Sequence, residues 1–392
     1  MKILLVGDAN SIFLIDYTKW LKKTIDIEVH IFSIQPKLKV NVDIPYDKIF
    51  YNSYHKHFFS KIPHIRALFY PYITSHSLVK TLHENNYIYD IIHYHWMASY
   101  SVLNVNKIKL FCKQLFITFW GGEWCSSILL YSHTLYINKL KRILDNADLI
   151  IQSSDNVKNE LLKFNINISN KYGYGTFGSA PLENLYKLID SESKLISKQK
   201  LGLPLNKITV VIGYSGKPLH NHINIINSLE KSIYKDTLKK KVILLAPMTY
   251  GCGKKYRMLV EDKLKKSGFE YLLFKNYWTT ETVARFRNSS DIVLQLSKFD
   301  GVSRSILEFL SAGSILISGS WINYKYFSDE GFKFIETDNN DEAINVLKKI
   351  TDDFYTNQNY YKSNIENGKN RYLWKDCIKL WIYHYKEFID NE

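Results

Sequence analysis

The chain has 392 residues, of which 46% are hydrophobic and 23% are charged, and its formal net charge is +14 at pH 7. This length is too great for one ordinary core and suits two domains of roughly 150–200 residues each. The composition excludes a disordered chain. Without a recognised nucleic-acid motif or a long basic tail, the positive charge does not indicate a nucleic-acid partner.

The cysteines and the start of the chain bear on its location. Cys112, Cys125, Cys252 and Cys377 lie far apart without a Cys-x-x-Cys pair, which favours reduced thiols over disulfides or a zinc site. The apolar run after Met1 is too short for a signal peptide, and no stretch reaches the ~18 apolar residues of a membrane span. We therefore expect a cytoplasmic protein.

The first half of the chain predicts a parallel sheet. Residues 3–6 form a buried apolar run, a segment with apolar residues at helical spacing follows, and residues 28–32 predict the next strand. A strand, a helix and a strand within about thirty residues make a βαβ unit. Later strands are predicted at 91–95, 115–119 and 149–152. Such continuous apolar runs are typical of a sheet covered on both faces.

Within this half, residues 54–72 interleave aromatic side chains with Lys56, Lys61 and Arg66. Such a surface suits the headgroup level of an anionic membrane, where each basic side chain contributes about 1 kcal/mol. The same pattern suits a helix whose aromatic side chains are core and whose bases are solvated. The sequence therefore leaves a peripheral association with anionic membrane open.

A second α/β series follows residues 165–205, which are rich in Gly, Pro, Lys and Ser and predict the connection between domains. Its strands are predicted at 207–213, 241–246, 271–274, 291–296 and 314–318, and a last helix spans about 371–389 with Trp374, Ile378, Trp381 and Tyr385 on one face. We therefore predict an α/β fold of two doubly wound, Rossmann-like domains. The predicted domains are residues 1–190 and 191–370, followed by a C-terminal helix within 371–392. Ligands of such sheets bind at the carboxyl ends of the strands, which in two domains can face one another across a cleft.

Residues 296–313 are the most informative stretch. A buried strand ends, a glycine-containing turn follows, and a helix is expected to begin near Ser303. The free backbone N–H groups at a helix start attract phosphate. Asp300 lies in the turn and Glu308 lies more than one turn into the helix, and carboxylates accept hydrogen bonds from sugar hydroxyls. Arg304 could add positive charge beside a diphosphate.

This stretch resembles the carboxylate motif of GT-B glycosyltransferases of family four, in which seven residues separate two Glu. Here Asp300 occupies the first position and Glu308 the second. The resemblance implies that Asp300 contacts the transferred sugar and that Glu308 binds the ribose of the nucleotide. It also implies that the amides of Gly301, Val302 and Ser303 serve the sugar or the phosphates.

The resemblance covers nearly the whole chain. Residues 90–96, 118–123 and 147–154 are similar to segments of the family's first domain, and the last helix resembles the one that crosses back onto that domain. The family binds its acceptor in the first domain, so the resemblance implies that Trp120, Gly121 and Gly122 contact the acceptor.

Two residues of the first domain are candidates near the acceptor. In an inverting reaction, the carboxylate of Glu123 could take the acceptor's proton, whereas in a retaining reaction it would only position the acceptor. His95 is the second candidate. For each of the two, a structural role at a strand end is the alternative.

The loop that opens the second domain contains Ser215, Gly216 and Lys217. In relatives, cations after this strand neutralise the diphosphate leaving group, and fixed cations and amides are the expected device when no metal takes part. Lys217 is the evident cation here. His220 and His222 are candidate helpers, with a loop-capping role as the alternative.

The resemblance puts the nucleobase near Tyr277, held by the backbone or by a ring, although Tyr277 and Trp278 could instead form a packed aromatic pair. Thr279 is expected to cap the next helix. No Asp-x-Asp follows a predicted strand, and Asp338 and Asp341 lie in a polar loop, so we expect no metal.

We therefore predict a metal-independent hexosyltransferase that acts with retention. It would move a sugar from a UDP-, GDP- or dTDP-linked donor, a co-substrate and not a cofactor, to a polysaccharide, lipopolysaccharide or lipid-linked oligosaccharide of the cell envelope. Residues 213–222 and 247–251 also resemble the inverting transferases that attach 4-acetamido-fucose. A GT-B-fold nucleotide-sugar epimerase and a non-catalytic sugar-nucleotide sensor are further alternatives. A nicotinamide dehydrogenase is disfavoured, because no Gly-x-Gly-x-x-Gly turn follows the first strand.

Overall fold

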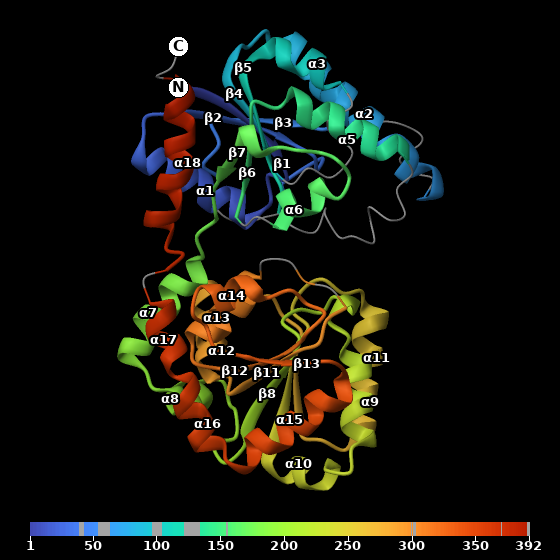
Figure 1. Ribbon diagram of the computed structural model, residues 1–392, viewed down its shortest axis with the longest axis vertical. Helices are drawn as coiled ribbons and strands as arrows, with labels where there is room; N and C mark the ends of the chain where they lie inside the picture. The colour runs from blue at the N-terminus through green and yellow to red at the C-terminus, as the bar shows by residue number, and fades with distance from the viewer. Residues whose placement is uncertain are drawn as a thin grey trace. The chain divides into compact units, whose positions relative to one another are not determined.

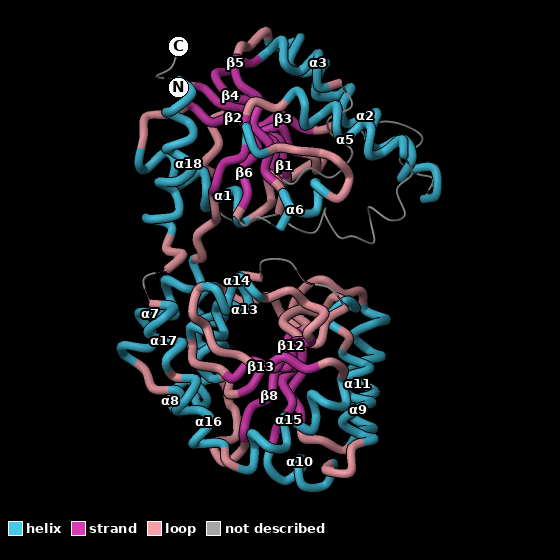
Figure 2. Tube along the Cα trace, in the orientation of Figure 1, coloured by secondary structure: helices cyan, strands magenta, loops and turns pink. Residues whose placement is uncertain are grey.

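The computed structural model describes residues 1–38, 43–53, 63–95, 104–120, 134–153, 156–298, 300, 303–369 and 371–389. The chain divides into two compact units. Unit 1 comprises Met1–Gly178 and Trp374–Glu392, and unit 2 comprises Ser179–Leu373. Each unit contains one parallel sheet with helices on both faces (Figure 1; Figure 2). This confirms the predicted α/β class with two doubly wound domains.

The sheet of unit 1 has the strand order β3-β2-β1-β4-β5-β6-β7, and its neighbouring strands pair in parallel. The strands are β1 (Lys2–Gly7), β2 (Glu28–Ser33), β3 (Lys48–Tyr51), β4 (Tyr89–His95), β5 (Cys112–Thr118), β6 (Leu149–Gln152) and β7 (Tyr172–Tyr174). The central strands are buried along nearly their whole length, since helices cover both faces.

Two hydrophobic clusters lie on the two faces of this sheet. One cluster contains side chains of α2 (Pro63–Asn85), α3 (Val105–Ile108), α5 (Thr134–Asn146) and α6 (Asn156–Leu162), and the other contains side chains of α1 (Ile12–Thr24) and α18 (Trp374–Ile389). Short 3₁₀ turns occur at η3 (Lys109–Phe111) and η5 (Ser169–Lys171).

Helix α18 comes from the end of the chain but belongs to unit 1. The four residues predicted on one face of this helix are all buried, which confirms that prediction. The Tyr385 hydroxyl accepts a hydrogen bond from the Tyr17 hydroxyl at 2.7 Å and lies 2.7 Å from Nδ1 of His93. Nε2 of His93 lies 2.7 Å from Oγ1 of Thr118. A buried chain of hydrogen bonds therefore connects α18 with α1, β4 and β5.

The sheet of unit 2 has the order β10-β9-β8-β11-β12-β13, and its neighbours also pair in parallel. The strands are β8 (Ile208–Ile212), β9 (Val242–Pro247), β10 (Tyr271–Phe274), β11 (Ile292–Gln295), β12 (Ile315–Gly319) and β13 (Ile335–Thr337). These strands confirm the five that the sequence predicts in this half and add β13.

Helices cover both faces of this second sheet (Figure 1). Side chains of α9 (His222–Lys231), α10 (Lys235–Lys241), α11 (Lys254–Ser267) and α15 (Asn340–Asp352) pack on one face, and those of α7 (Ala180–Ser191), α12 (Thr280–Ser289) and α13 (Arg304–Ser311) pack on the other. The remaining elements are α8 (Lys194–Lys200), η6 (Pro218–His220), α14 (Lys325–Asp329), α16 (Phe354–Tyr361) and α17 (Ser363–Gly368).

The boundary between the two units, at Gly178 and Ser179, lies inside the segment 165–205 that was predicted as the connection, and this segment also contains β7, α7 and α8. Residues 179–190, which the prediction placed in the first domain, belong to unit 2. The reason is that Leu182 and Leu185 of α7 are fully buried in the same hydrophobic cluster as α12 and α13.

Two observations concern the membrane. Among the described residues, we find no helix that is both long and apolar enough to cross a bilayer. The side chains of the aromatic and basic segment 54–72 lie outside the described residues.

Candidate functional site

The strand order of unit 2 marks where a ligand would bind. Strand β8 lies between β9 and β11, so the chain moves to one side of β8 through β9 and β10 and to the other through β11 to β13. In such sheets the connections after the two central strands run to opposite faces and leave a crevice at the carboxyl ends. The residues after β8 and β11 are the ones that the sequence singles out, 213–217 and 297–303.

Asp300, after β11, is held by three donors. Its Oδ1 accepts a hydrogen bond from the Tyr214 hydroxyl at 2.8 Å. Its Oδ2 accepts from the Tyr324 hydroxyl at 2.5 Å and from Nε2 of Gln295 at 2.7 Å. Burial, together with the charge of Asp300, raises the pKa of both tyrosines well above the usual value, so both hydroxyls stay protonated and donate. The orientation of the Asp300 carboxylate is therefore fixed.

Helix α13 starts where the sequence predicts. Ser303 is its N-cap, and Oγ of Ser303 accepts from the Ile306 N–H at 3.4 Å. The N–H of Ser303, predicted to serve the sugar or the phosphates, donates to the Tyr326 hydroxyl at 3.1 Å. The Arg304 guanidinium lies 4.2 Å from the centroid of the Tyr372 ring. The other two residues predicted to offer amides, Gly301 and Val302, lie outside the described residues.

Glu308 forms a buried ion pair. It is 5% exposed, its Oε2 accepts from Nε of Arg287 at 3.1 Å, and its Oε1 accepts from Oγ of Ser179 at 2.9 Å. Arg287 is also 5% exposed, and its guanidinium lies 4.1 Å from the centroid of the Phe309 ring. Because each carboxylate oxygen has two lone pairs, each oxygen keeps capacity for one more donor.

The loop after β8 is tightly packed except at Lys217. Ser215 is fully buried, and the N–H of Gly216 donates to the Tyr250 carbonyl at 2.8 Å. A Cβ at Gly216 would come within 2.6 Å of Sγ of Cys252, so glycine is required for this close approach. The Lys217 side chain is exposed and makes no ion pair with any residue in the described part of the chain. Lys217 is therefore a cation available to a ligand.

The two histidines of this loop carry no positive charge near neutral pH. Burial, together with the nearby charges of His222 and Lys217, lowers the pKa of His220 to about 3. Burial lowers the pKa of His222 to about 4. Neutral rings could serve a diphosphate only as hydrogen-bond donors, and the positive charge of this loop would come from Lys217.

Two consecutive aromatic residues in the turn after β10, Tyr277 and Trp278, have different surroundings. Tyr277 is 75% exposed, and its ring centroid lies 6.5 Å from that of Tyr250. Trp278 packs against Phe286 at 4.7 Å. Thr279 is the N-cap of α12, as predicted. The two aromatics do not form a packed pair of their own, and the Tyr277 ring is open to a ligand.

In unit 1, His95 ends β4 and lies next to β1, where the strand order also divides. It is 1% exposed, and burial lowers its pKa to about 3. Its ring centroid lies 4.0 Å from that of His93 and 5.1 Å from that of Tyr17. Trp120 packs 5.2 Å from Phe177, at the edge of the same cluster.

Three of the residues predicted near the acceptor lie outside the described part of the chain. They are Gly121, Gly122 and Glu123. The structure therefore places His95 and Trp120 together in unit 1. The predicted roles of Gly121, Gly122 and Glu123 stay predictions.

The buried neutral histidines predict acid lability in both units. Unit 1 contains His93 and His95 and unit 2 contains His220 and His222, and burial lowers the pKa of all four. Below about pH 6.5, the pKa of histidine in an unfolded chain, these histidines bind protons in the unfolded state but stay neutral in the folded state. The folded state is therefore fully stabilised above about pH 6.5 and loses this stability as the pH falls toward the folded-state pKa. Each histidine should cost about 2 kcal/mol of unfolding free energy between pH 7 and pH 5. Thermal unfolding at constant ionic strength should show this decline, and a flat midpoint over this range would contradict it.

Sequence reasoning missed the residues that hold the two acids, namely Tyr214, Gln295, Tyr324, Arg287 and Ser179. The sequence could have indicated Gln295, because it is a polar residue at the carboxyl end of a predicted buried strand. Arg287 lies within a helix and belongs to no recognisable motif. In the described residues, no three His, Cys, Asp or Glu side chains gather in a way that could hold a metal ion.

Comparison with known proteins places the fold. No family model matches the chain, and no curated protein matches it. Among solved structures, sucrose-phosphate synthase from Thermosynechococcus elongatus superposes with a TM-score of 0.76 at 12% identity, covering 100% of both chains. A glycosyltransferase from Rickettsia africae gives a TM-score of 0.71 at 14% identity, covering 100% of this chain and 99% of that one. HepE of Anabaena with UDP and glucose gives 0.65 at 14% identity, covering 99% and 100%. At these identities the likeness establishes the fold, two Rossmann-like domains of the GT-B type.

Proposed function

We propose that the chain is a glycosyltransferase that uses a nucleotide sugar as its donor and binds that donor on unit 2. The observation that carries this proposal is the Asp300 carboxylate, held by three donors at the carboxyl edge of the sheet where the strand order divides. A fixed carboxylate accepts hydrogen bonds from sugar hydroxyls without an entropic cost for its own orientation.

Each group of the donor would meet one of the residues described above. Asp300 would accept hydrogen bonds from the transferred sugar. Glu308 would accept from ribose hydroxyls with the capacity left on its oxygens, and Lys217 would stabilise the diphosphate. The exposed ring of Tyr277 would lie against the base. A fixed cation in this role is consistent with transfer that needs no metal.

We propose a UDP-linked hexose as the first donor to test. The HepE structures hold UDP, UDP with glucose, and UDP-glucose, and a trehalose-phosphate synthase from Burkholderia xenovorans with a TM-score of 0.69 at 13% identity is described as UDP-forming. The fold likeness supports this choice over the GDP- and dTDP-linked donors, which remain in the test.

For the acceptor we propose a polysaccharide, a lipopolysaccharide or a lipid-linked oligosaccharide, bound by unit 1 near His95, Trp120 and Glu123. Transfer would proceed with retention, in the cytoplasm or at the inner face of the cytoplasmic membrane. His95 is neutral at pH 7, so it could accept a hydrogen bond from an acceptor hydroxyl but would not supply a positive charge.

Thermal unfolding in the presence of nucleotide sugars tests the donor. UDP-, GDP- and dTDP-linked hexoses are added separately, each with and without EDTA, and free hexose is the control. A donor present at a hundred times its Kd adds about 2.7 kcal/mol of stability. We expect a shift with UDP-glucose that EDTA does not remove, and no shift with any nucleotide sugar would reject the proposal. Anomeric analysis of the product then separates retention from inversion.

A further inference from the structure

Unit 2 contains a cavity of about 500 Å³ that is separate from the candidate donor site. It is lined by Ile208, the first residue of β8, by Asp291, just before β11, and by Gly313, just before β12. These are the amino ends of parallel strands, whereas Asp300 and Lys217 follow the carboxyl ends. The cavity therefore lies at the opposite edge of the same sheet.

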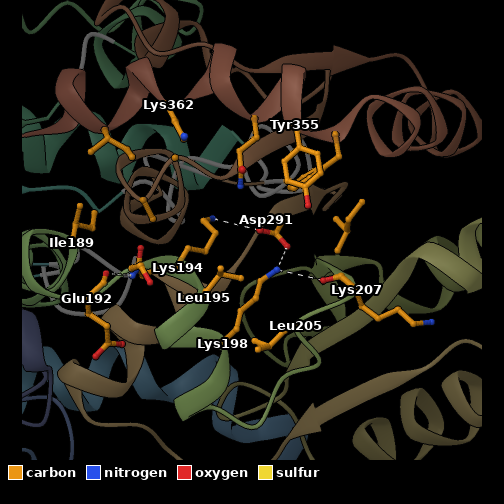
Figure 3. Close-up of a pocket in the computed structure, with 18 of the residues that line it drawn as sticks. Ile189, Glu192, Lys194, Leu195, Lys198, Leu205, Lys207, Asp291, Tyr355 and Lys362 are labelled. Atoms are coloured by element: carbon orange, nitrogen blue, oxygen red, sulfur yellow. Dashed lines mark hydrogen bonds and ion pairs between the residues drawn. The ribbon is translucent and has the colours of Figure 1, made fainter.

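Much of the cavity wall is apolar. Figure 3 shows Ile189, Leu195 and Leu205 around it, with the Tyr355 ring on the side of α16. Further apolar lining comes from Phe354 and Ile365. Its volume lies in the range of pockets that hold small organic ligands, about 300–1,000 Å³. Leu195 is 58% exposed, Leu205 53% and Tyr355 80%, so an apolar body lying in the cavity would cover apolar surface that is otherwise open to solvent.

The two acids that line the cavity are already neutralised. Asp291 is 2% exposed, forms an ion pair with Lys198, and accepts from the N–H of Thr209 at 2.9 Å. Glu192 accepts from Oγ of Ser197 at 2.6 Å and pairs with Lys200 and with Arg285. Neither carboxylate presents an uncompensated negative charge to the cavity.

Two further lysines line the cavity. Lys194 of α8 donates to the Ser290 carbonyl at 2.5 Å and shares the Asp291 carboxylate with Lys198, so that one negative charge faces two ammonium groups (Figure 3). Lys362, between α16 and α17, makes no ion pair with any residue that the structure describes, and its charge acts on Lys194. Burial, together with the charges of Lys198 and Lys362, lowers the pKa of Lys194 to about 8 against the pull of Asp291. An anion at this position would relieve the repulsion between the ammonium groups.

We propose that this cavity is a second binding site, for a small organic anion whose apolar body lies among Ile189, Leu195, Leu205 and Tyr355 and whose anionic group pairs with Lys194 and Lys362. The site is independent of the proposed transferase activity, because none of the residues assigned to the donor lines it.

Fluorescence of anilinonaphthalene sulfonate, which carries an aromatic body and one sulfonate, tests this site in the full chain. We expect saturable binding that sodium octanoate displaces and that octanol at the same concentration does not. Lys194→Gln with Lys362→Gln should weaken binding about tenfold, since two charged hydrogen-bond donors are lost. The single change Lys362→Gln, at an exposed position, should weaken it in the same direction. Lys187→Gln, an exposed lysine of α7 outside the lining, is the matched control.

Three outcomes would overturn the proposal: no saturable binding of the dye, equal displacement by octanoate and octanol, or unchanged affinity in the double variant with an intact unfolding transition. If the double variant does not fold, the proposal is judged on Lys362→Gln alone, and an unchanged dye affinity of this variant would overturn it. No nucleotide sugar enters the experiment, so its result is separate from the donor test.

Discussion

Asp300→Asn should lower the rate of glycosyl transfer by about a hundredfold or more, the loss usually seen when one electrostatic contact to a transition state is removed. The substitution keeps the shape of the side chain but replaces an acceptor by an amide that also donates. That amide would face Tyr214, Gln295 and Tyr324, all of which donate to the carboxylate in the folded protein. The measurement is kcat/KM with the donor that gives a thermal shift.

The control for this prediction is Asp338→Asn. Asp338 is an exposed acid of the same unit, and its carboxylate accepts from Oγ of Ser320 at 2.8 Å. We expect wild-type activity from this variant. Full activity of Asp300→Asn, with the protein folded, would exclude Asp300 from the contact with the transferred sugar.

Glu308→Ala should lower the unfolding free energy of unit 2 by about 3–5 kcal/mol, because it leaves a buried cation without its partner. The cation is Arg287, which is 5% exposed and donates to Glu308 at 3.1 Å. The same change should abolish the thermal shift caused by UDP-glucose, since the ribose would lose its acceptor. Urea unfolding of the full chain measures the first effect and the ligand-dependent melting temperature measures the second.

A second variant separates the two effects. Glu308→Ala combined with Arg287→Leu removes the whole ion pair, and we expect it to recover most of the lost stability, as replacement of buried ion pairs by apolar residues often does. Binding of the nucleotide sugar should stay lost in this double variant. A recovered shift with UDP-glucose would show that Glu308 is needed for the fold of the site and does not bind ribose.

The fold was predictable where a strand is apolar on both faces. The runs at 3–6, 149–152 and 271–274 have that character, and β1, β6 and β10 form there. The strands β3, β7 and β13 were not predicted, because each of them contains a polar residue or a glycine and forms no continuous apolar run.

The helices α7 and α8 within the segment 165–205 were missed because α8 lacks a regular apolar face: Leu195 and Ile196 are exposed, whereas Ser197 and Lys198 are buried. The helix-start signals were present: Ser179 accepts from the Leu182 N–H, Pro181 lies in the first turn, and Ser193 accepts from the Ile196 N–H. Given more weight, these caps would have predicted α7 and α8.

The candidate site was predictable only where it is local in sequence. Asp300, the Ser303 cap and Glu308 lie within nine residues of one strand–turn–helix segment, so their relation follows from spacing. Their partners come from elsewhere in the chain, since Tyr214 follows β8, Tyr324 follows β12 and Arg287 belongs to α12. Spacing carries no information on such pairs, because only the strand order brings them together. The neutral state of His220 could not be predicted from the sequence either, because it depends on the burial of the ring.

The buried hydrogen bonds between Tyr385, Tyr17 and His93 have a consequence for synthesis on the ribosome. Unit 1 needs α18, whose residues are translated after all of unit 2. Until α18 is translated, the part of the first sheet that α18 covers stays exposed beside α1, while the second unit already has its complete sequence and can fold. A chaperone that binds apolar surface has its longest opportunity on that face, and shortening the chain before Trp374 would leave the first unit, and not the second, unfinished.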